Sequence, residues 1–166
     1  FYTVLEYVEG GSLRQILDRR TRLPLPEALA VFRQIAAALD YAHGLGVVHR
    51  DVSPGNILVA KAGARALLTD FGIARDGGAP ITVTRAIMGT PGYLSPEHAQ
   101  SATAVTHLSD LFSLGIVLYQ MLSGELPWEE SPGLPEGPPF GPIIGLRERG
   151  VEGLPSDVDR VLRTLL

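Results

Sequence analysis

The segment from Leu111 to Leu122 constrains the fold more than any other part of this sequence, because it is apolar on nearly every side. Ser109 precedes the segment as a helix cap and Gly124 follows it, so we expect a helix that ends at Gly124. A helix that is apolar all round lies at the centre of a domain, where other elements cover it. Polar residues and a glycine interrupt the apolar run, which is also too short to span a bilayer.

Length and composition predict one compact domain. The chain has 166 residues, of which 45% are apolar and 19% are charged, and its net charge is −4. This acidic balance argues against nucleic acid or an acidic membrane surface as the main partner. Cysteine is absent from the sequence, which excludes disulfides and Cys-ligated zinc and fits a reducing compartment. We therefore expect a cytoplasmic domain without membrane contact in this segment, although the parent protein can be anchored to a membrane elsewhere.

Periodicity and turn residues predict the remaining elements. Residues 1–7 are expected to form a strand that ends in a turn at 9–11, and Ser12 is expected to cap a short helix through Arg19. A long helix is predicted from Pro26 to Gly44 or Gly46, with an apolar face formed by Leu29, Phe32, Ile35, Ala36, Leu39 and Ala42. The other expectations are an extended piece at 47–51, a turn at 52–55, a hairpin from 57–59 and 66–69, loops at 76–95 and 124–142, and a last helix that begins near 156.

The predicted hairpin brings polar side chains together. Asn56 and Asp70 lie seven residues on either side of Gly63, so a hairpin that turns there places both at the same open end. A carboxylate and an amide carbonyl suit a hard cation such as Mg²⁺, which takes its other ligands from water and phosphate. Asp51 lies five residues before Asn56, across a turn that contains Pro54, so its carboxylate can face the same pocket. A base beside a metal-held phosphate is the minimum that phosphoryl transfer to a hydroxyl requires.

Each of these residues alone is common at turns, but their joint order and spacing carry a family resemblance. Residues 49–56 (HRDVSPGN), 70–72 (DFG) and 89–97 (GTPGYLSPE) resemble the catalytic loop, the metal loop and the end of the activation segment of protein kinases. Residues 70–75 (DFGIAR) and 93–99 (YLSPEHA) resemble the bacterial eukaryotic-like serine/threonine kinases in particular.

The resemblance implies an α+β fold and a partial catalytic domain. Residues 1–11 are expected to be the last small-lobe strand and the hinge, and residues 12–166 the large lobe, which is mainly helical with a small β-hairpin at the active site. Both ends of the chain fall inside predicted elements, so we expect the rest of the small lobe and the final helices to lie outside this segment.

The resemblance also implies the roles of the residues around the nucleotide. Asp51 is expected to accept or orient the proton of the substrate hydroxyl, and Asn56 and Asp70 are expected to hold Mg²⁺, or Mn²⁺ in its place. ATP is the expected cofactor and a protein the expected substrate, with a kinase homodimer as a further implied assembly. The adenine is expected to contact Leu5, the hinge backbone from Glu6 to Val8, and Leu58. For Leu5 and Leu58, a plain core role explains the residue type nearly as well.

Structural and regulatory positions follow from the same resemblance. Asp110 resembles a buried helix aspartate that braces the catalytic loop by accepting backbone N–H bonds, although a first-turn acid is also favoured by the helix dipole alone. His49 is expected to be a structural core histidine, and Glu97 to pair with an arginine beyond this segment. Thr82 and Thr84 resemble phosphorylation sites. The remaining positions are Phe71 and Gly72 in the metal loop, Arg50 and Arg75 as a basic pocket for such a phosphate, and Thr90, which favours Ser/Thr over Tyr substrates.

One departure weakens the expectation of full activity. Kinases of this kind carry a lysine two residues after the catalytic aspartate, where this sequence has Ser53, and a hydroxyl supplies no positive charge. Lys61 is the only lysine among the fourteen basic residues and falls in the hairpin loop. We therefore expect the isolated segment to be inactive. Two alternatives to an active serine/threonine kinase stay open: a pseudokinase that binds nucleotide or partners, and a small-molecule phosphotransferase of related fold, which gives no reason for residues 89–97.

Overall fold

A computed structural model describes residues 6–61, 65–71, 90, 92–100, 104–128 and 141–166 of the chain. The elements in these ranges are β1 (Gly10–Ser12), α1 (Leu13–Arg20), α2 (Leu25–Gly44), the 3₁₀ turn η1 (Pro54–Asn56), β2 (Ile57–Ala60), β3 (Ala66–Leu68), α3 (Pro96–Gln100), α4 (His107–Ser123) and α5 (Ser156–Leu165). They confirm the expected α+β class, mainly helical with one small hairpin. The strand expected at 1–5 and most of the loop expected at 76–95 lie outside the described residues.

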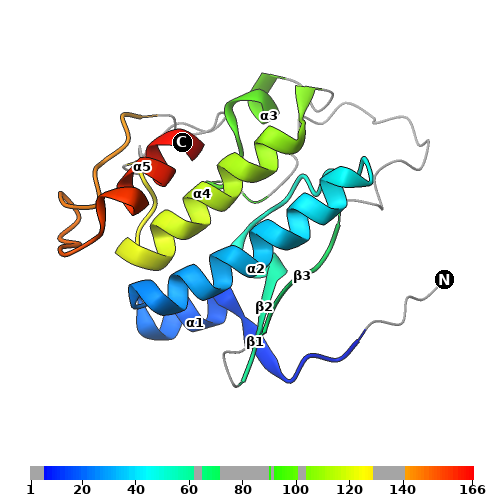
Figure 1. Ribbon diagram of the computed structural model, residues 1–166, viewed down its shortest axis with the longest axis horizontal. Helices are drawn as coiled ribbons and strands as arrows, with labels where there is room; N and C mark the ends of the chain where they lie inside the picture. The colour runs from blue at the N-terminus through cyan, green and yellow to red at the C-terminus, as the bar shows by residue number, and fades with distance from the viewer. Residues whose placement is uncertain (1–5, 62–64, 72–89, 91, 101–103, 129–140) are drawn as a thin grey trace.

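Helix α4 is the centre of the packing, as its all-round apolar sequence predicts. It contacts α2 on one side and α5 on another, and the three helices run side by side in Figure 1. The helix begins two residues before Ser109, at His107, because Thr106 and not Ser109 is the N-cap. The Ser109 hydroxyl accepts the Thr106 N–H and so completes a capping box. The helix ends at Gly124, whose φ of 86° is left-handed and suits glycine at a helix C-terminus.

Helix α2 matches the predicted length, but its buried face differs from the predicted one. Residues Ala28, Val31, Ile35, Leu39 and Ala42 are buried, whereas Leu29, Phe32 and Ala36 are only partly covered. The predicted face is therefore confirmed at Ile35, Leu39 and Ala42, and Phe32 and Ala36 also pack against the core. Periodicity missed Ala28 and Val31, because it admits neighbouring stripes of apolar residues.

The segment 9–11 was predicted to turn, and this prediction is wrong for Gly10 and Gly11. They begin β1, which pairs antiparallel with β2 so that Gly10 lies opposite Ala60. A Cβ atom on Gly10 would come within 2.1 Å of the Val59 carbonyl oxygen, so glycine is needed here for close approach between strands. Ser12 then caps α1 as expected, and it forms a capping box with Gln15.

The hairpin exists as predicted, with its register displaced by one residue. The sheet order is β1-β2-β3, and Ile57 pairs with Leu68. Thr69 rather than Asp70 therefore lies opposite Asn56, and the Thr69 N–H donates to the Asn56 carbonyl over 2.9 Å. Asp70 follows at once with a left-handed φ of 58°, so it still lies at the open end of the hairpin beside Asn56.

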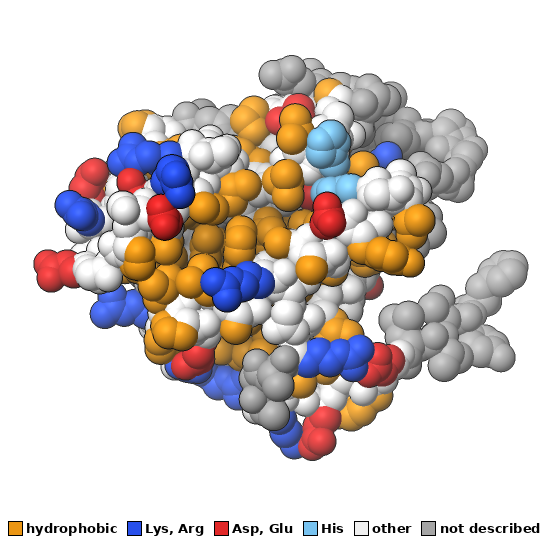
Figure 2. Space-filling model, viewed as in Figure 1, with side chains coloured by type: hydrophobic (Ala, Val, Ile, Leu, Met, Phe, Trp, Pro, Cys, Tyr) orange, Lys and Arg blue, Asp and Glu red, His pale blue; other side chains and the backbone are white. Residues whose placement is uncertain are grey.

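The short helix α3 was not predicted, whereas α5 begins at Ser156 as expected. Figure 2 shows apolar side chains across the middle of the face formed by α2, α4 and α5, with charged side chains around and between them. Within the ranges that the structure describes, no helix is both long and apolar enough to cross a membrane.

Candidate active site

The loop from His49 to Asp51 is held by the first turn of α4. Asp110, only 1% exposed, accepts hydrogen bonds from the backbone N–H groups of His49 and Arg50, each over 2.8 Å. Arg50 has a φ of 70°, a left-handed conformation that costs a non-glycine residue about 1–2 kcal/mol. Because charge-assisted bonds to a buried carboxylate are strong, Asp110 offsets this strain and fixes the direction in which the chain enters Asp51.

His49 joins the catalytic-loop segment to the end of the hairpin. Its fully buried ring bonds through Nε2 to the Thr69 carbonyl oxygen over 2.8 Å, and its Nδ1 accepts the Asp51 N–H over 3.2 Å. The ring therefore carries its proton on Nε2. Its edge also packs against Phe71, with ring centroids 4.6 Å apart. With both nitrogens occupied, His49 has a position that fits a structural role.

The Asp51 carboxylate is fixed by donors on both of its oxygens. Oδ1 accepts from the backbone N–H and the hydroxyl of Thr90, each over 3.0 Å. Oδ2 accepts from the Asn56 amide over 3.0 Å, and the same amide donates to the Asp51 carbonyl over 2.8 Å. The structure thus brings together Asp51, Asn56 and Thr90, which lie up to 39 residues apart in sequence. These hydrogen bonds hold the Asp51 carboxylate in one orientation, which a group that accepts a proton from a bound substrate requires.

Asn56 and Asp70 provide oxygen atoms at the open end of the hairpin. The Asn56 amide nitrogen faces Asp51, which leaves its carbonyl oxygen as an acceptor. Asp70 is exposed, and its Oδ2 accepts from the Thr69 hydroxyl over 3.4 Å. One amide oxygen and one carboxylate fit Mg²⁺, which keeps several waters and binds few protein groups. The ranges described contain no group of three or more histidine, aspartate or glutamate side chains that could form an all-protein metal cage.

Ser53 lies next to this cluster without adding a charge. Its side chain is 2% exposed, and its hydroxyl oxygen lies 3.3 Å from the Thr90 hydroxyl. Lys61, the only lysine of the chain, is engaged elsewhere, because it pairs with Glu9 at the far end of β2. Neither residue thus brings an ammonium group to the oxygen atoms of Asp51, Asn56 and Asp70.

Of the residues expected around adenine, Glu6 and Val8 lie in the segment before β1, and Leu58 lies on β2. Glu6 is exposed and forms an ion pair with Arg65, whose hydrogen bond and charge lower the pKa of the Glu6 carboxyl group. Val8 and Leu58 are partly buried, and Leu58 pairs with Ser12 and Leu67 in the sheet. The ion pair ties the segment around Glu6 to the base of β3.

Helix α3 carries Glu97 toward the start of α4. Burial acts to raise the pKa of Glu97, but the hydrogen bond from the Ser109 hydroxyl and others outweigh it, and the net pKa is lowered. The neighbouring His98 accepts the Ser95 N–H at Nδ1 over 3.2 Å, and burial lowers the pKa of its ring. The other residues expected to act in the metal loop, the activation segment and the adenine pocket lie outside the described residues: Leu5, Gly72, Arg75, Thr82 and Thr84.

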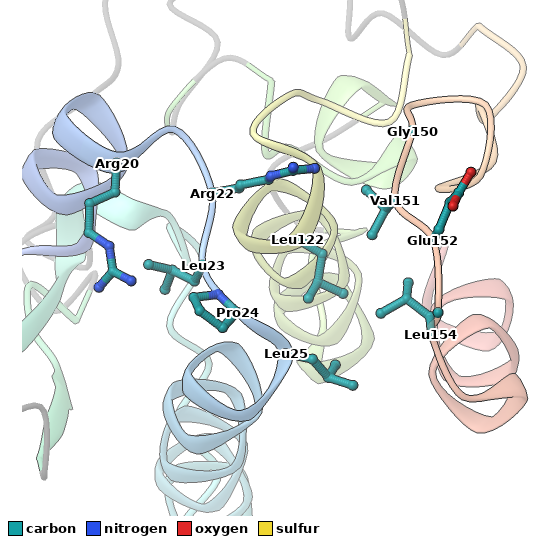
Figure 3. Close-up of a pocket in the computed structure, with 11 residues that line it drawn as sticks. Arg20, Arg22, Leu23, Pro24, Leu25, Leu122, Gly150, Val151, Glu152 and Leu154 are labelled. Carbon is teal, nitrogen blue, oxygen red and sulfur yellow. The ribbon is translucent and has the colours of Figure 1, made fainter.

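A separate cavity of about 720 Å³ lies at the other end of α4 (Figure 3). Leu23, Leu25, Leu122, Val151 and Leu154 form its apolar walls, and Arg20, Arg22 and Glu152 also line it. Leu122 is about 18 Å from Asp110 along the helix axis at 1.5 Å per residue. The cavity therefore does not belong to the cluster around Asp51.

Sequence reasoning singled out Asp51, Asn56 and Asp110, which the structure brings together in one region, but it missed two contacts. Thr90 donates two hydrogen bonds to Asp51, and no local sequence pattern indicates that the loops carrying these two residues lie close together. The bond between His43 Nε2 and Asp110 Oδ2, 2.8 Å long, was also missed, because a lone histidine at the end of an amphipathic helix has no distinguishing spacing.

Comparison with known proteins assigns most of the chain. The model of the protein kinase domain matches residues 1–136. The chain is 45% identical over 128 residues to the serine/threonine-protein kinase PknA of Mycobacterium tuberculosis, an alignment that covers 76% of this chain and 29% of the relative. It is 44% identical over 128 residues to a probable serine/threonine-protein kinase of Clostridium perfringens, covering 76% of this chain and 18% of the relative.

A probable serine/threonine-protein kinase of Bifidobacterium longum, PknB, is 43% identical over 130 residues, which cover 76% of this chain and 19% of that protein. The chain thus matches less than a third of the length of these curated relatives.

Proposed function

The chain belongs to the protein kinase family, and we propose that the complete protein that carries it transfers the terminal phosphate of ATP to serine or threonine hydroxyls of proteins. The observation that supports this most is the Asp51 carboxylate, which three donors hold in place. Relatives at 43–45% identity bear serine/threonine-kinase names. We place the reaction in the cytoplasm, where ATP and protein substrates meet.

In the proposed reaction, Asp51 orients the substrate hydroxyl and takes its proton. The hydroxyl oxygen forms a bond to the terminal phosphorus as the bond from that phosphorus to the ADP oxygen breaks. When bound, Mg²⁺ would supply positive charge to offset the charge that develops on the phosphate oxygens. Asn56 and Asp70 are the residues that would hold the ion. Asn56 also orients the Asp51 carboxylate, because its amide nitrogen donates a hydrogen bond to Asp51 Oδ2.

The Ser53 position predicts a slow enzyme. Family members have a lysine there, which meets the transferring phosphate, whereas Ser53 offers only a neutral hydroxyl that is already 3.3 Å from that of Thr90. This same observation favours a second candidate function, a pseudokinase that binds nucleotide or a partner protein without turnover. The intact trio of Asp51, Asn56 and Asp70 favours the enzyme.

The deciding experiment compares the complete protein with its Asp51→Asn variant. We expect phosphate incorporation from radiolabelled ATP into a generic Ser/Thr substrate, and a decrease of about 10²–10⁴-fold in the variant, because general-base assistance is lost. ATP binding, followed by fluorescence of a labelled nucleotide, serves as the control and should change little. Equal incorporation by both proteins would remove Asp51 from the mechanism. Nucleotide binding without any incorporation would establish the pseudokinase.

Thr82 and Thr84 extend the proposal to regulation. A kinase homodimer in which one copy phosphorylates the other at these threonines would bring a phosphate near Arg50 and Arg75. Mass-spectrometric mapping of the protein after incubation with ATP and Mg²⁺ tests this, since phosphate at neither threonine would remove them as activation sites.

A further inference from the structure

Tyr93 connects the region around Asp51 to the last turn of α4. Its N–H donates to the carbonyl of Thr90, the residue whose own N–H and hydroxyl donate to Asp51. The Tyr93 side chain is buried, and its hydroxyl donates to Gln120 Oε1 over 2.5 Å. With that oxygen engaged, the Gln120 side chain offers its NH₂ group, which can only donate. Gln120 is partly exposed, so this donor lies near the protein surface.

Arg14 approaches the same tyrosine from the first turn of α1. This helix begins at the fully buried Leu13 and packs against η1, the turn that follows Ser53. Burial raises the pKa of the Tyr93 hydroxyl, and the positive charge of Arg14 acts in the opposite direction, which requires the guanidinium group to lie near that hydroxyl. Arg14 is exposed, and in the part of the chain that the structure describes it forms no ion pair. Its charge is therefore available to a ligand.

A carboxylate also acts on this position. Asp18 lies one turn after Arg14 on α1 and is exposed, and its negative charge raises the pKa of Tyr93. The effect of Asp18 on Tyr93 is smaller than that of Arg14. The guanidinium group of Arg14 and the amide of Gln120 therefore give this surface hydrogen-bond donors and positive charge, which are what an anionic group requires.

We propose that Arg14 and Gln120 form a subsite for an acidic side chain of the protein substrate, so that serines and threonines with a nearby aspartate or glutamate are preferred. The inference rests on the proposed kinase function and adds the chemical class of its substrate. A carboxylate fits because the planar guanidinium group can donate two parallel hydrogen bonds to it, and the Gln120 amide can donate a third. Thr90 contacts Asp51 and Tyr93 contacts Gln120, so a substrate segment of a few residues reaches both places.

The test measures phosphorylation of synthetic peptides by the complete protein. Each peptide carries a single threonine, and a glutamate, glutamine or lysine is placed in turn at every position within about five residues of it. We expect glutamate at one or two of these positions to raise kcat/KM about 5- to 20-fold over glutamine, because a partly exposed charge-assisted contact has this strength. Lysine at the same positions should lower kcat/KM below the value for glutamine.

Charge variants show whether Arg14 recognises the glutamate. Arg14→Glu should reverse the order of preference, so that the lysine peptide becomes the better substrate, a change that a purely structural role of Arg14 does not produce. Asp18→Asn should increase the preference for glutamate about two- to threefold, because it removes a repelling charge. Arg19→Glu is the matched control: Arg19 lies on another face of α1, where its Nε donates to the Gln15 carbonyl, and its replacement should leave the order unchanged. KM for ATP should stay within about twofold in all variants.

Failure of the subsite and failure of the kinase assignment give different results. If Asp51-dependent transfer shows no preference for glutamate, or a preference that Arg14→Glu leaves unchanged, the subsite is wrong while the kinase function stands. If the complete protein transfers no phosphate, the proposed function is wrong, and fluorescence anisotropy of the labelled glutamate peptides decides the subsite separately. Binding that Arg14→Glu abolishes would support the subsite, whereas binding that is absent or indifferent to Arg14 would overturn it.

Discussion

The hydroxyl of Thr90 faces two acceptors, Asp51 and Ser53, but has one proton to donate. The charged oxygen of Asp51 lies at 3.0 Å and the neutral oxygen of Ser53 at 3.3 Å, so the proton is directed to Asp51. In sequence, Thr90 could be recognised only as part of a motif. Its contact with Asp51 depends on the path of the chain between the two loops, which no residue pattern encodes locally.

Replacement of Thr90 tests this bond. Thr90→Val keeps the backbone N–H bond to Asp51 and removes the hydroxyl, so we expect kcat of the complete protein to fall about tenfold, which corresponds to about 1.4 kcal/mol. Thr90→Ser keeps the hydroxyl and should stay within about threefold of the unaltered protein. Ser53→Ala removes the other acceptor and serves as the control. A larger loss in Ser53→Ala than in Thr90→Val would show that Asp51 is not the functional partner of Thr90.

At the scale of elements, helices were predictable and strand details were not. The cap at Ser12 and the glycine after α4 are local signals that mark the observed boundaries, whereas the predicted cap of α4 at Ser109 lies three residues after the observed cap, Thr106. The strand β1 escaped prediction because Gly10 and Gly11 indicate a turn unless β2 lies close by. The one-residue difference in hairpin register has a similar origin, since pairing depends on the loop between the strands.

Glycines at two helix ends offer a matched test of this reasoning. Gly124 has a φ of 86°, and a Cβ atom there would lie 2.8 Å from Thr21 Cγ2 and 3.1 Å from the Thr21 carbonyl oxygen. We expect Gly124→Ala to lower the free energy of unfolding by about 1–2 kcal/mol. Gly44, at the end of α2, has open space around its Cα, so Gly44→Ala should be neutral or stabilising by up to about 1 kcal/mol. Urea unfolding of both variants measures the difference, and equal effects would contradict the role assigned to Gly124.

At the scale of the whole molecule, helix α3 makes stability depend on pH. Burial lowers the pKa of His98 below its ordinary 6.5, and hydrogen bonds from Ser109 and others outweigh burial to lower the pKa of Glu97 below 4.5. In both cases the unfolded chain binds its proton at a higher pH than the folded chain. Stability is therefore fully present above the unfolded pKa and is lost as pH falls toward the folded pKa.

We thus expect the free energy of unfolding to fall as the pH decreases below 6.5 through His98, and to fall further below pH 4.5 through Glu97. Urea unfolding at a series of pH values measures this profile. In His98→Gln the decline between pH 6.5 and 4.5 should become shallower, while the decline below pH 4.5 should persist. A profile that keeps its full slope between pH 6.5 and 4.5 in this variant would assign the effect to another group.

The charge distribution of the whole chain also predicts that residues 1–166 alone lack transfer activity. Phosphoryl transfer in this family uses lysines that meet the phosphates, and Lys61 is the only lysine here. It pairs with Glu9 at the hairpin, where the two side chains are about 70% exposed, and Ser53 occupies the position of the loop lysine.

We expect the isolated chain to incorporate no phosphate above the level of its Asp51→Asn variant, whereas the complete protein should exceed its own variant clearly. Radiolabelled ATP and a common substrate measure all four proteins together. Turnover by the isolated chain that Asp51→Asn abolishes would show that Asp51, Asn56 and Asp70 with Mg²⁺ suffice, without any ammonium group on the transferred phosphate.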